Sequence, residues 1–193
     1  MAGHARYTAL PDACVLYPVA CADALMSLAA AGLFAAKWTQ AIEQEWMRSL
    51  ERLRPELAGR LGVRRDAMRE VVPDWEVPEG AWRPHAANLK LPDPGDAHVL
   101  AAAVAGHADC VVTSNLKDFP AAAVAPYGIE VMHPDDFIVK QIDLEWVSAL
   151  AAFKSMRARW KRPAASAADF AQALERNGLA ATAERLRQAL SLI

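Results

Sequence analysis

Short apolar segments alternate with helical segments along the first two thirds of the chain, and this alternation constrains the fold more than any other feature. The runs at residues 7–10, 110–113 and 128–132 have the length and apolar character of buried strands. Segments with helical patterns separate them, such as the alanine-rich residues 19–31. Strands that alternate with helices form a mostly parallel sheet with helices on both faces. We therefore predict a three-layer α/β/α fold.

The pattern changes toward the C-terminus. From about Asp143 onward every predicted element is a helix, and Ser166 with Asp169 resembles the capping box that starts one of them. We therefore predict two parts, an α/β domain over residues 1–140 and an all-helical C-terminal extension over residues 141–193.

Two stretches before the second strand are less regular. Residues 55–70 resemble a helix that is interrupted or kinked near Gly59 and Gly62. Residues 71–92 contain four prolines and fit no single period, which favours a covering loop with at most a short strand.

Composition limits the classes of function. The formal net charge of −2 gives no overall attraction for nucleic acid, so a polyanion would need a local basic patch. The three cysteines, Cys14, Cys21 and Cys110, lack a metal-ligand spacing and suit a reducing compartment. No apolar run approaches the ~18 residues that span a membrane, so we expect a cytoplasmic protein.

Acidic side chains occur where α/β sheets place functional groups. Asp12 follows the first predicted strand, and Asp118 follows the second strand after Asn115. Asp93 and Asp96 lie at the entry to a predicted helix. Each has an ordinary alternative role, because aspartate commonly caps helices or hydrogen-bonds to the backbone of its own turn.

Two glutamates are further candidates. Thr39 is a plausible N-cap of a helix whose apolar face carries Ile42, Trp46, Leu50 and Leu53. Glu43 and Glu45 border that face, although most glutamates in such places are solvated surface residues.

If the strands are parallel neighbours, these acids meet at one edge of the sheet. Clustered carboxylates repel one another, so their pKa values rise unless a cation is present. Oxygen ligands without a histidine–cysteine pair suit Mg²⁺ or Mn²⁺, and such a site can hydrolyse phosphodiesters through a metal-activated water. His98 and His107 have no evident partners and are predicted to lie on helix surfaces.

Four blocks of the sequence, in this order, resemble the acidic blocks of PIN-domain proteins, most closely those of VapC-like toxins. They are Leu10-Pro11-Asp12-Ala13-Cys14-Val15-Leu16-Tyr17-Pro18, Ile42-Glu43-Gln44-Glu45-Trp46, Leu91-Pro92-Asp93-Pro94-Gly95-Asp96-Ala97-His98-Val99-Leu100 and Thr113-Ser114-Asn115-Leu116-Lys117-Asp118-Phe119. The resemblance covers roughly residues 6–140. It implies a Mg²⁺- or Mn²⁺-dependent endoribonuclease of a toxin–antitoxin pair, inhibited by a cognate antitoxin.

The resemblance also assigns residues. The acids implied to bind metal and carry catalysis are Asp12, Glu45, Asp96 and Asp118, with Glu43 as the alternative to Glu45. Asp93, Thr113 and Asn115 are implied to support them. Gly95 stands where this branch often has an acid, which weakens the case for a second tightly held metal.

The expected substrates are structured or single-stranded loops of RNA, such as those of tRNA. An acidic site needs basic groups around it to attract the phosphates of such RNA. The candidates for this contact are Lys37, Arg64, Arg65 and Lys117. The extension has a second basic group that could contact RNA, bind an antitoxin or simply form a solvated helix end, and it consists of Arg157, Arg159, Lys161 and Arg162. Part of the apolar surface is expected to bind the antitoxin or a second copy of the chain. Two other functions stay open, a PIN-type nuclease without a toxin role and a catalytically weak interaction module.

Overall fold

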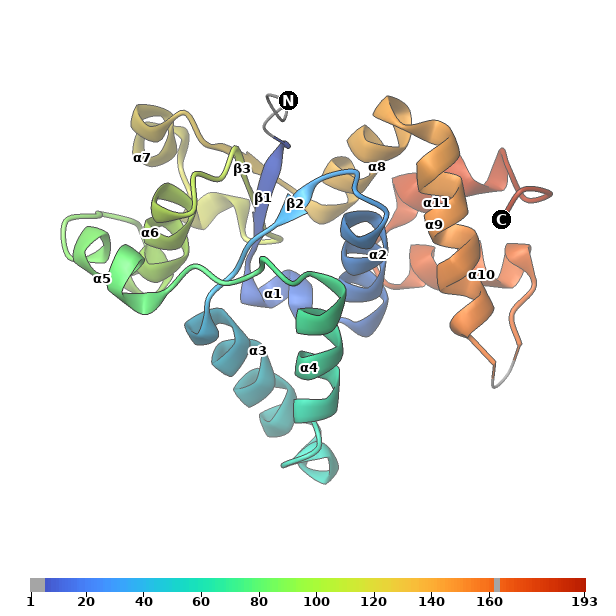
Figure 1. The fold of residues 1–193 in the computed structure, drawn as a ribbon, viewed down its shortest axis with the longest axis horizontal. Helices are drawn as coiled ribbons and strands as arrows, with labels where there is room; N and C mark the ends of the chain where they lie inside the picture. Colours follow the sequence, from blue (N-terminus) through green and yellow to red (C-terminus); the bar gives the residue numbers. More distant parts are fainter. Residues whose placement is uncertain (1–5, 162–163) are drawn as a thin grey trace.

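A four-stranded parallel sheet forms the centre of the computed structural model, which describes residues 6–161 and 164–193 (Figure 1). The strands are β1 (Thr8–Pro11), β2 (Ala35–Ala36), β3 (Cys110–Val112) and β4 (Glu130–Met132), in the order β2-β1-β3-β4. All three strand pairs are parallel. The predicted α/β/α fold is confirmed, and only the two-residue β2 was too short to give a sequence pattern.

The register of β1 and β3 brings two polar residues together at the carboxyl edge of the sheet. Leu10 pairs with Val111 and Pro11 with Val112, and both strands are buried. The amide of Asp12 continues the ladder by donating to the Val112 carbonyl at 2.9 Å. Asp12 and Thr113, the next residue of each strand, therefore lie side by side.

Helices cover both faces of the sheet (Figure 1). The helices α5, α6 and α7 lie on one side and α2 lies on the other, while α3 and α4 extend beyond the lower end of the sheet in this view. Their bounds are α1 (Ala13–Leu16), α2 (Val19–Ala30), α3 (Gln40–Leu53), α4 (Gly62–Val71), α5 (Glu79–Ala86), α6 (Ala97–Ala105) and α7 (Ala121–Val124). Thr39 caps α3 as predicted, because its hydroxyl accepts from the Ile42 amide at 3.1 Å.

One local prediction is confirmed and another needs correction. The helical stretch over residues 55–70 is interrupted as predicted, because the 3₁₀ helix η1 (Pro55–Leu57) ends before Gly59, which has a φ of +71°, and α4 begins at Gly62. Leu53 is 62% exposed and does not belong to the core, because it lies in the last turn of α3.

The region predicted as a covering loop contains the helix α5. This helix includes Pro84 and packs along α6, with Trp82 buried. Burial of a tryptophan side chain contributes about 1.5–3 kcal/mol or more, which offsets the poor helix propensity of the segment.

The C-terminal part is all-helical, as predicted, and packs on the side of α2 (Figure 1). It comprises α8 (Pro134–Leu144), α9 (Trp146–Arg159), α10 (Ala167–Arg176) and α11 (Ala180–Arg187). Ser166 and Asp169 form the predicted capping box. The predicted division after residue 140 falls within α8 and stays a prediction.

The extension is tied to the sheet domain by apolar and polar contacts. Phe137 of α8 contacts Phe34, which precedes β2, with ring centroids 4.8 Å apart. Arg159 of α9 donates to Asp23 and Ser27 of α2, which adds polar contacts between the two parts. Within the C-terminal part, buried Asp135 of α8 accepts hydrogen bonds from the Ala181 and Thr182 amides at the start of α11, at 2.7 and 2.8 Å.

Leu144 and Val147 are 75% and 79% exposed and do not belong to the apolar face of the extension. They flank the break between α8 and α9 at Glu145, outside the packed faces of both helices.

Among the described residues, no helix is both long and apolar enough to cross a membrane.

Candidate active site

Asp12 is held at the carboxyl end of β1 by two side-chain donors. The residue is only 3% exposed, and its Oδ2 accepts from the Thr113 hydroxyl at 2.8 Å and from the Cys14 thiol at 3.1 Å. Although Asp12 precedes α1, its side chain makes no capping hydrogen bond to that helix. The geometry therefore favours a fixed carboxylate at the sheet edge over a simple capping residue.

The loop after β3 is organised around Thr113. The Thr113 hydroxyl accepts from the Asn115 amide at 3.0 Å, and the Ser114 amide donates to the Cys14 sulfur at 3.3 Å. These contacts shape the turn that leads into the 3₁₀ helix η3 (Leu116–Asp118), which carries Asp118. Asn115 contributes here through its backbone amide.

Cys14 belongs to this network and was not singled out as a site residue from the sequence. Burial and the nearby Asp12 charge raise the pKa of its thiol to about 12. The thiol is therefore protonated near neutral pH and can donate to Asp12. Its position two residues after Asp12, in the first block, is the signal that could have found it.

The two aspartates before α6 have different environments. Asp93 caps the 3₁₀ helix η2 (Pro94–Asp96), because its Oδ1 accepts from the Gly95 amide at 2.7 Å. Asp96 occupies the N-cap position of α6 but makes no side-chain capping bond. The capping alternative therefore describes Asp93 and does not describe Asp96.

The other candidate acids raise the pKa of Asp96. Its pKa is raised to about 6, first by burial and then by the negative charges on four neighbouring carboxylates. These carboxylates belong to Asp12, Asp93, Asp118 and Glu45. Each of these four carboxylates is therefore near enough to Asp96 to oppose its ionisation.

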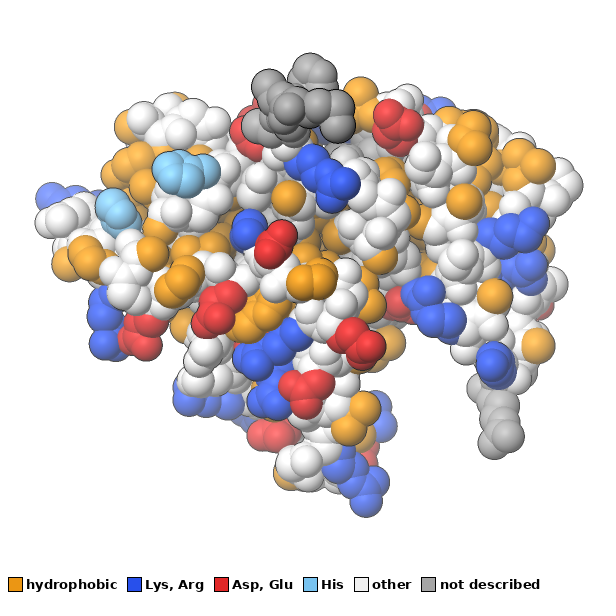
Figure 2. Space-filling view, viewed as in Figure 1, with side chains coloured by type: hydrophobic (Ala, Val, Ile, Leu, Met, Phe, Trp, Pro, Cys, Tyr) orange, Lys and Arg blue, Asp and Glu red, His pale blue; other side chains and the backbone are white. Residues whose placement is uncertain are grey.

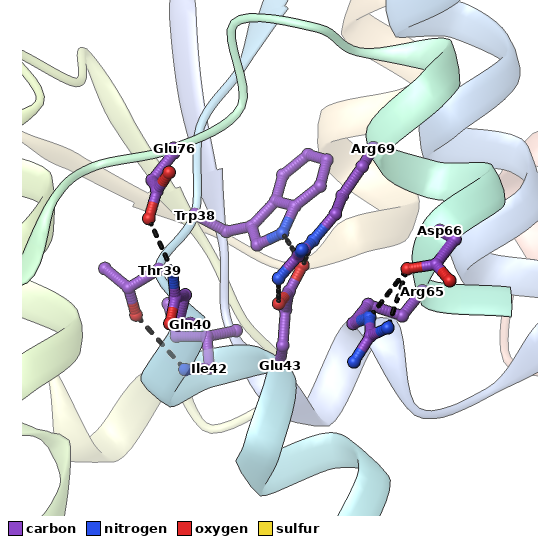
Figure 3. Close-up of polar contacts among 9 residues, drawn as sticks. All are labelled: Trp38, Thr39, Gln40, Ile42, Glu43, Arg65, Asp66, Arg69 and Glu76. Carbon is purple, nitrogen blue, oxygen red and sulfur yellow. Dashed lines mark hydrogen bonds and ion pairs between the residues drawn. The ribbon is translucent and has the colours of Figure 1, made fainter. Parts of the chain in front are cut away.

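Glu43, by contrast, forms an ion pair with Arg69 in which the Glu43 side chain is buried (Figure 3). Its Oε1 accepts from the Trp38 indole N–H at 2.9 Å and from Arg69 Nε at 2.9 Å. Trp75 stacks on Trp38 with ring centroids 5.3 Å apart, and the Arg69 guanidinium lies 4.4 Å from the Trp75 ring centre. Glu43 thus joins α3 to α4 and the segment that follows it.

Glu45 and His98 form a contact that the sequence did not predict. Glu45 Oε2 lies 3.1 Å from Nε2 of His98, which is in the first turn of α6. The prediction that His98 lies on a helix surface without a partner is therefore wrong, because α5 packs along α6 and places Trp82 beside His98, and the Glu45 side chain of α3 also reaches it. His107 lies in the turn after α6, at a φ of +51°.

Most of the predicted RNA-contacting residues make contacts within the chain. Arg64 donates to the Leu16 and Tyr17 carbonyls and stacks on Trp46. Arg65 pairs with Asp66 (Figure 3), and Lys37 donates to the Asp74 carbonyl. Lys117 is exposed in η3, next to Asp118.

The arginines of the extension also have structural contacts. Arg157 donates to the Ala165 and Ile193 carbonyls, and Arg159 bonds to Asp23 and Ser27 of α2. Arg162 lies outside the described residues. Positive and negative side chains are interspersed over the part of the surface formed by α3 and α4 (Figure 2), so this face has no continuous basic patch.

The acids fit a hard divalent cation in their chemistry. They are all oxygen donors, and the raised pKa of Asp96 reports a repulsion that a cation would relieve. Within the described residues, no three His, Cys, Asp or Glu side chains stand close enough to form a ligand set as placed. The carboxylates are thus near enough to influence the pKa of Asp96, but their oxygen atoms do not surround one common position.

The environment of Asp96 predicts a stability effect in protein kept free of divalent cations by EDTA. The carboxyl ionises at its ordinary pKa of 3.8 when unfolded but at about 6 when folded. Its contribution to stability is therefore full below pH 3.8 and is lost as the pH rises through 6. Asp96→Asn should raise the melting temperature by about 2–4 °C near pH 7.5, an effect of roughly 1 kcal/mol after discounting for its partial exposure.

The control for this prediction is the same melting experiment near pH 4, where the folded wild-type carboxyl is mostly protonated. The advantage of Asp96→Asn should shrink there. Equal melting temperatures of the two proteins near pH 7.5 would show that the neighbouring acids do not oppose ionisation of Asp96.

Two family models match the chain. A family model described as "PIN domain" matches residues 8–117, which is more than half of the chain. A second model, described as "VapC50 C-terminal domain", matches residues 134–188. The first match contains β1 and the acids of the site, except for Asp118, which follows its last residue, and the second begins with α8.

One curated relative is similar over a short stretch. It is the Mycobacterium tuberculosis protein named "Putative ribonuclease VapC50", which is 57% identical over 49 residues. The match spans 25% of this chain and 29% of that protein. No solved structure matches the chain.

Proposed function

Because this chain belongs to the PIN-domain family, we propose that it is a metal-dependent endoribonuclease. The observation that carries the proposal is that the carboxylates of Asp12, Asp93, Asp118 and Glu45 are near enough to Asp96 to oppose its ionisation. Oxygen donors of this kind suit Mg²⁺ or Mn²⁺. A bound cation would also relieve the repulsion that raises the pKa of Asp96.

In this proposal the metal ligands are Asp12, Glu45, Asp96 and Asp118. A bound cation would activate water for attack on phosphorus and stabilise the leaving oxygen. Glu43 is not among the proposed ligands, because its carboxylate already pairs with Arg69 and Trp38.

The surrounding residues keep the acids in place. The Thr113 hydroxyl and Cys14 thiol fix one oxygen of Asp12, which limits the movement of that carboxylate. Asp93 and the amide of Asn115 hold the two loops that carry Asp96 and Asp118. We propose Lys117 as the first contact for RNA phosphates, because it is exposed on the same short helix as Asp118.

The proposed substrate is RNA with accessible, unpaired nucleotides, such as a tRNA loop, because proteins that recognise specific RNA sequences mostly bind single-stranded loops and ends, where the bases are exposed. We further propose that the protein is the toxin of a toxin–antitoxin pair and is inhibited by a cognate antitoxin. The similarity to a protein named as a ribonuclease of the VapC type supports this role. A second copy of the chain stays the alternative partner for its exposed apolar surface.

Mapping RNA ends in cells tests the proposal directly. Brief expression of the wild-type chain should create new RNA 5′ ends and arrest growth, whereas Asp96→Asn should do neither. Asp136→Asn is the matched control, because Asp136 is an exposed aspartate on α8 outside the acidic site. Identical new ends with wild type and Asp96→Asn would contradict the site, and cleavage without growth arrest would favour a nuclease with a role other than a toxin.

A further inference from the structure

His98 lies between the acidic site and helix α5. Its Nε2 contacts Glu45 Oε2 at 3.1 Å, and its ring centroid lies 6.1 Å from that of Trp82. The other ring nitrogen, Nδ1, is buried and has no hydrogen-bond partner within residues 6–161 and 164–193. Nε2 is therefore the nitrogen through which this imidazole makes its polar contact.

Glu45 is the most exposed of the acids proposed to bind the cation and needs a reason to stay in place. Its side chain is 47% exposed, whereas that of His98 is only 22% exposed. A half-exposed glutamate has several rotamers in solution, and confining it costs entropy. A hydrogen bond from a ring that is itself packed against Trp82 lowers that cost before any ligand arrives.

The position of His98 in the chain links this contact to the rest of the site. It lies two residues after Asp96, in the first turn of α6, while Glu45 comes from α3, 53 residues earlier in the sequence. The contact therefore joins the two helices that carry two of the proposed ligands.

We propose that His98 is a positioning residue that donates through Nε2 to Glu45 and orients its carboxylate for a divalent cation shared with Asp96. This inference rests on the proposed metal-dependent function. It assigns His98 no contact with the cation or with RNA. Residues that hydrogen-bond to metal ligands typically change metal affinity or activity by about 10–100-fold when they are replaced.

The test measures Mn²⁺ binding to the RNA-free protein by isothermal titration calorimetry. His98→Phe keeps a ring against Trp82 but removes the donor, and it should weaken Mn²⁺ binding by about tenfold or more. His98→Gln restores an N–H near the position of Nε2 and should recover most of that loss. If the larger phenylalanine ring destabilises the fold, His98→Leu replaces it as the variant without a donor.

A purely structural role would give a different pattern. Melting temperatures in EDTA report packing alone, and they should be similar for His98→Phe and His98→Gln. Equal Mn²⁺ affinity of wild type and His98→Phe would overturn the proposal, and so would equal weakening by His98→Phe and His98→Gln. In a Glu45→Gln background, His98→Phe should cause little further loss, because the two residues act through one contact.

Failure of this inference is distinguishable from failure of the proposed function. If wild-type protein binds Mn²⁺ and cleaves RNA while His98→Phe binds Mn²⁺ equally well, only the role of His98 is wrong. If wild-type protein binds no Mn²⁺, the metal-dependent function and the role of His98 are both overturned.

Discussion

The Asp12→Asn variant is expected to lose RNA cleavage by about a thousandfold while keeping its fold. The amide retains the size of the side chain and an oxygen that can accept from Thr113 and Cys14, so the sheet edge should stay intact. It lacks the negative charge that the proposed cation needs. A catalytic metal contributes several kcal/mol to transition-state stabilisation, and each ~1.4 kcal/mol corresponds to a tenfold change in rate.

Single-turnover cleavage of a short unpaired RNA with saturating Mn²⁺ measures this loss. Asp136→Asn serves as the control for a change of one charge on the surface, and circular dichroism confirms that both variants are folded. Cleavage by Asp12→Asn within tenfold of the wild-type rate would show that the carboxylate at the end of β1 is not needed for the reaction.

The sequence allowed Asp12 and Thr113 to be placed correctly because both follow strands that are apolar and short. Once β1 and β3 are parallel neighbours, the register Pro11–Val112 fixes the next residues of the two strands beside each other. This part of the site depends on local patterns and a general rule of α/β sheets, so it could be predicted without a structure.

The contacts of the two glutamates could not be predicted in the same way. Glu43 and Glu45 are two residues apart on one helix and equally plausible as surface residues. What distinguishes them is distant in the sequence, namely Arg69 for Glu43 and His98 for Glu45. Such pairings depend on how helices pack, and helical periodicity carries no information about the partner helix.

The helix α5 was missed for a related reason. Pro84 and the neighbouring prolines weaken every local helix signal in this region, but burial of Trp82 against α6 stabilises the helix. Tertiary packing commonly outweighs intrinsic propensity in this way. The same packing places Trp82 beside His98, a neighbour that could not be predicted while the helix itself was missed.

Because Glu43 and Glu45 have different contacts, replacing each of them by glutamine should have opposite effects on stability and on RNA cleavage. Glu43→Gln should lower the free energy of unfolding by about 2–3 kcal/mol, because it leaves Arg69 without its counter-ion in a mostly buried contact. This figure lies below the range for fully buried pairs, because the Arg69 side chain is 32% exposed. Glu45→Gln should change stability by less than ~0.5 kcal/mol, because that side chain is half exposed.

Cleavage should show the reverse order. Glu45→Gln removes a proposed ligand and should lower the single-turnover rate on the order of 100-fold, or about 2.7 kcal/mol of transition-state stabilisation. Folded Glu43→Gln, assayed well below its melting temperature, should cleave at nearly the wild-type rate. Urea unfolding measures the free energy of unfolding of both variants, and Mn²⁺-dependent cleavage of the same RNA measures their single-turnover rates.

A double-mutant cycle decides whether the effect of Glu43 comes from the ion pair. Arg69→Met should destabilise the fold by a similar amount, since it leaves the Glu43 charge buried. Combining Glu43→Gln with Arg69→Met should cost clearly less than the sum of the two single changes, because no uncompensated charge is left. If the losses of unfolding free energy are additive, the destabilisation by Glu43→Gln comes from altered packing against Trp38 and Trp75 and not from the ion pair. Loss of cleavage in Glu43→Gln at unchanged stability would exchange the roles of the two glutamates and make Glu43 the ligand.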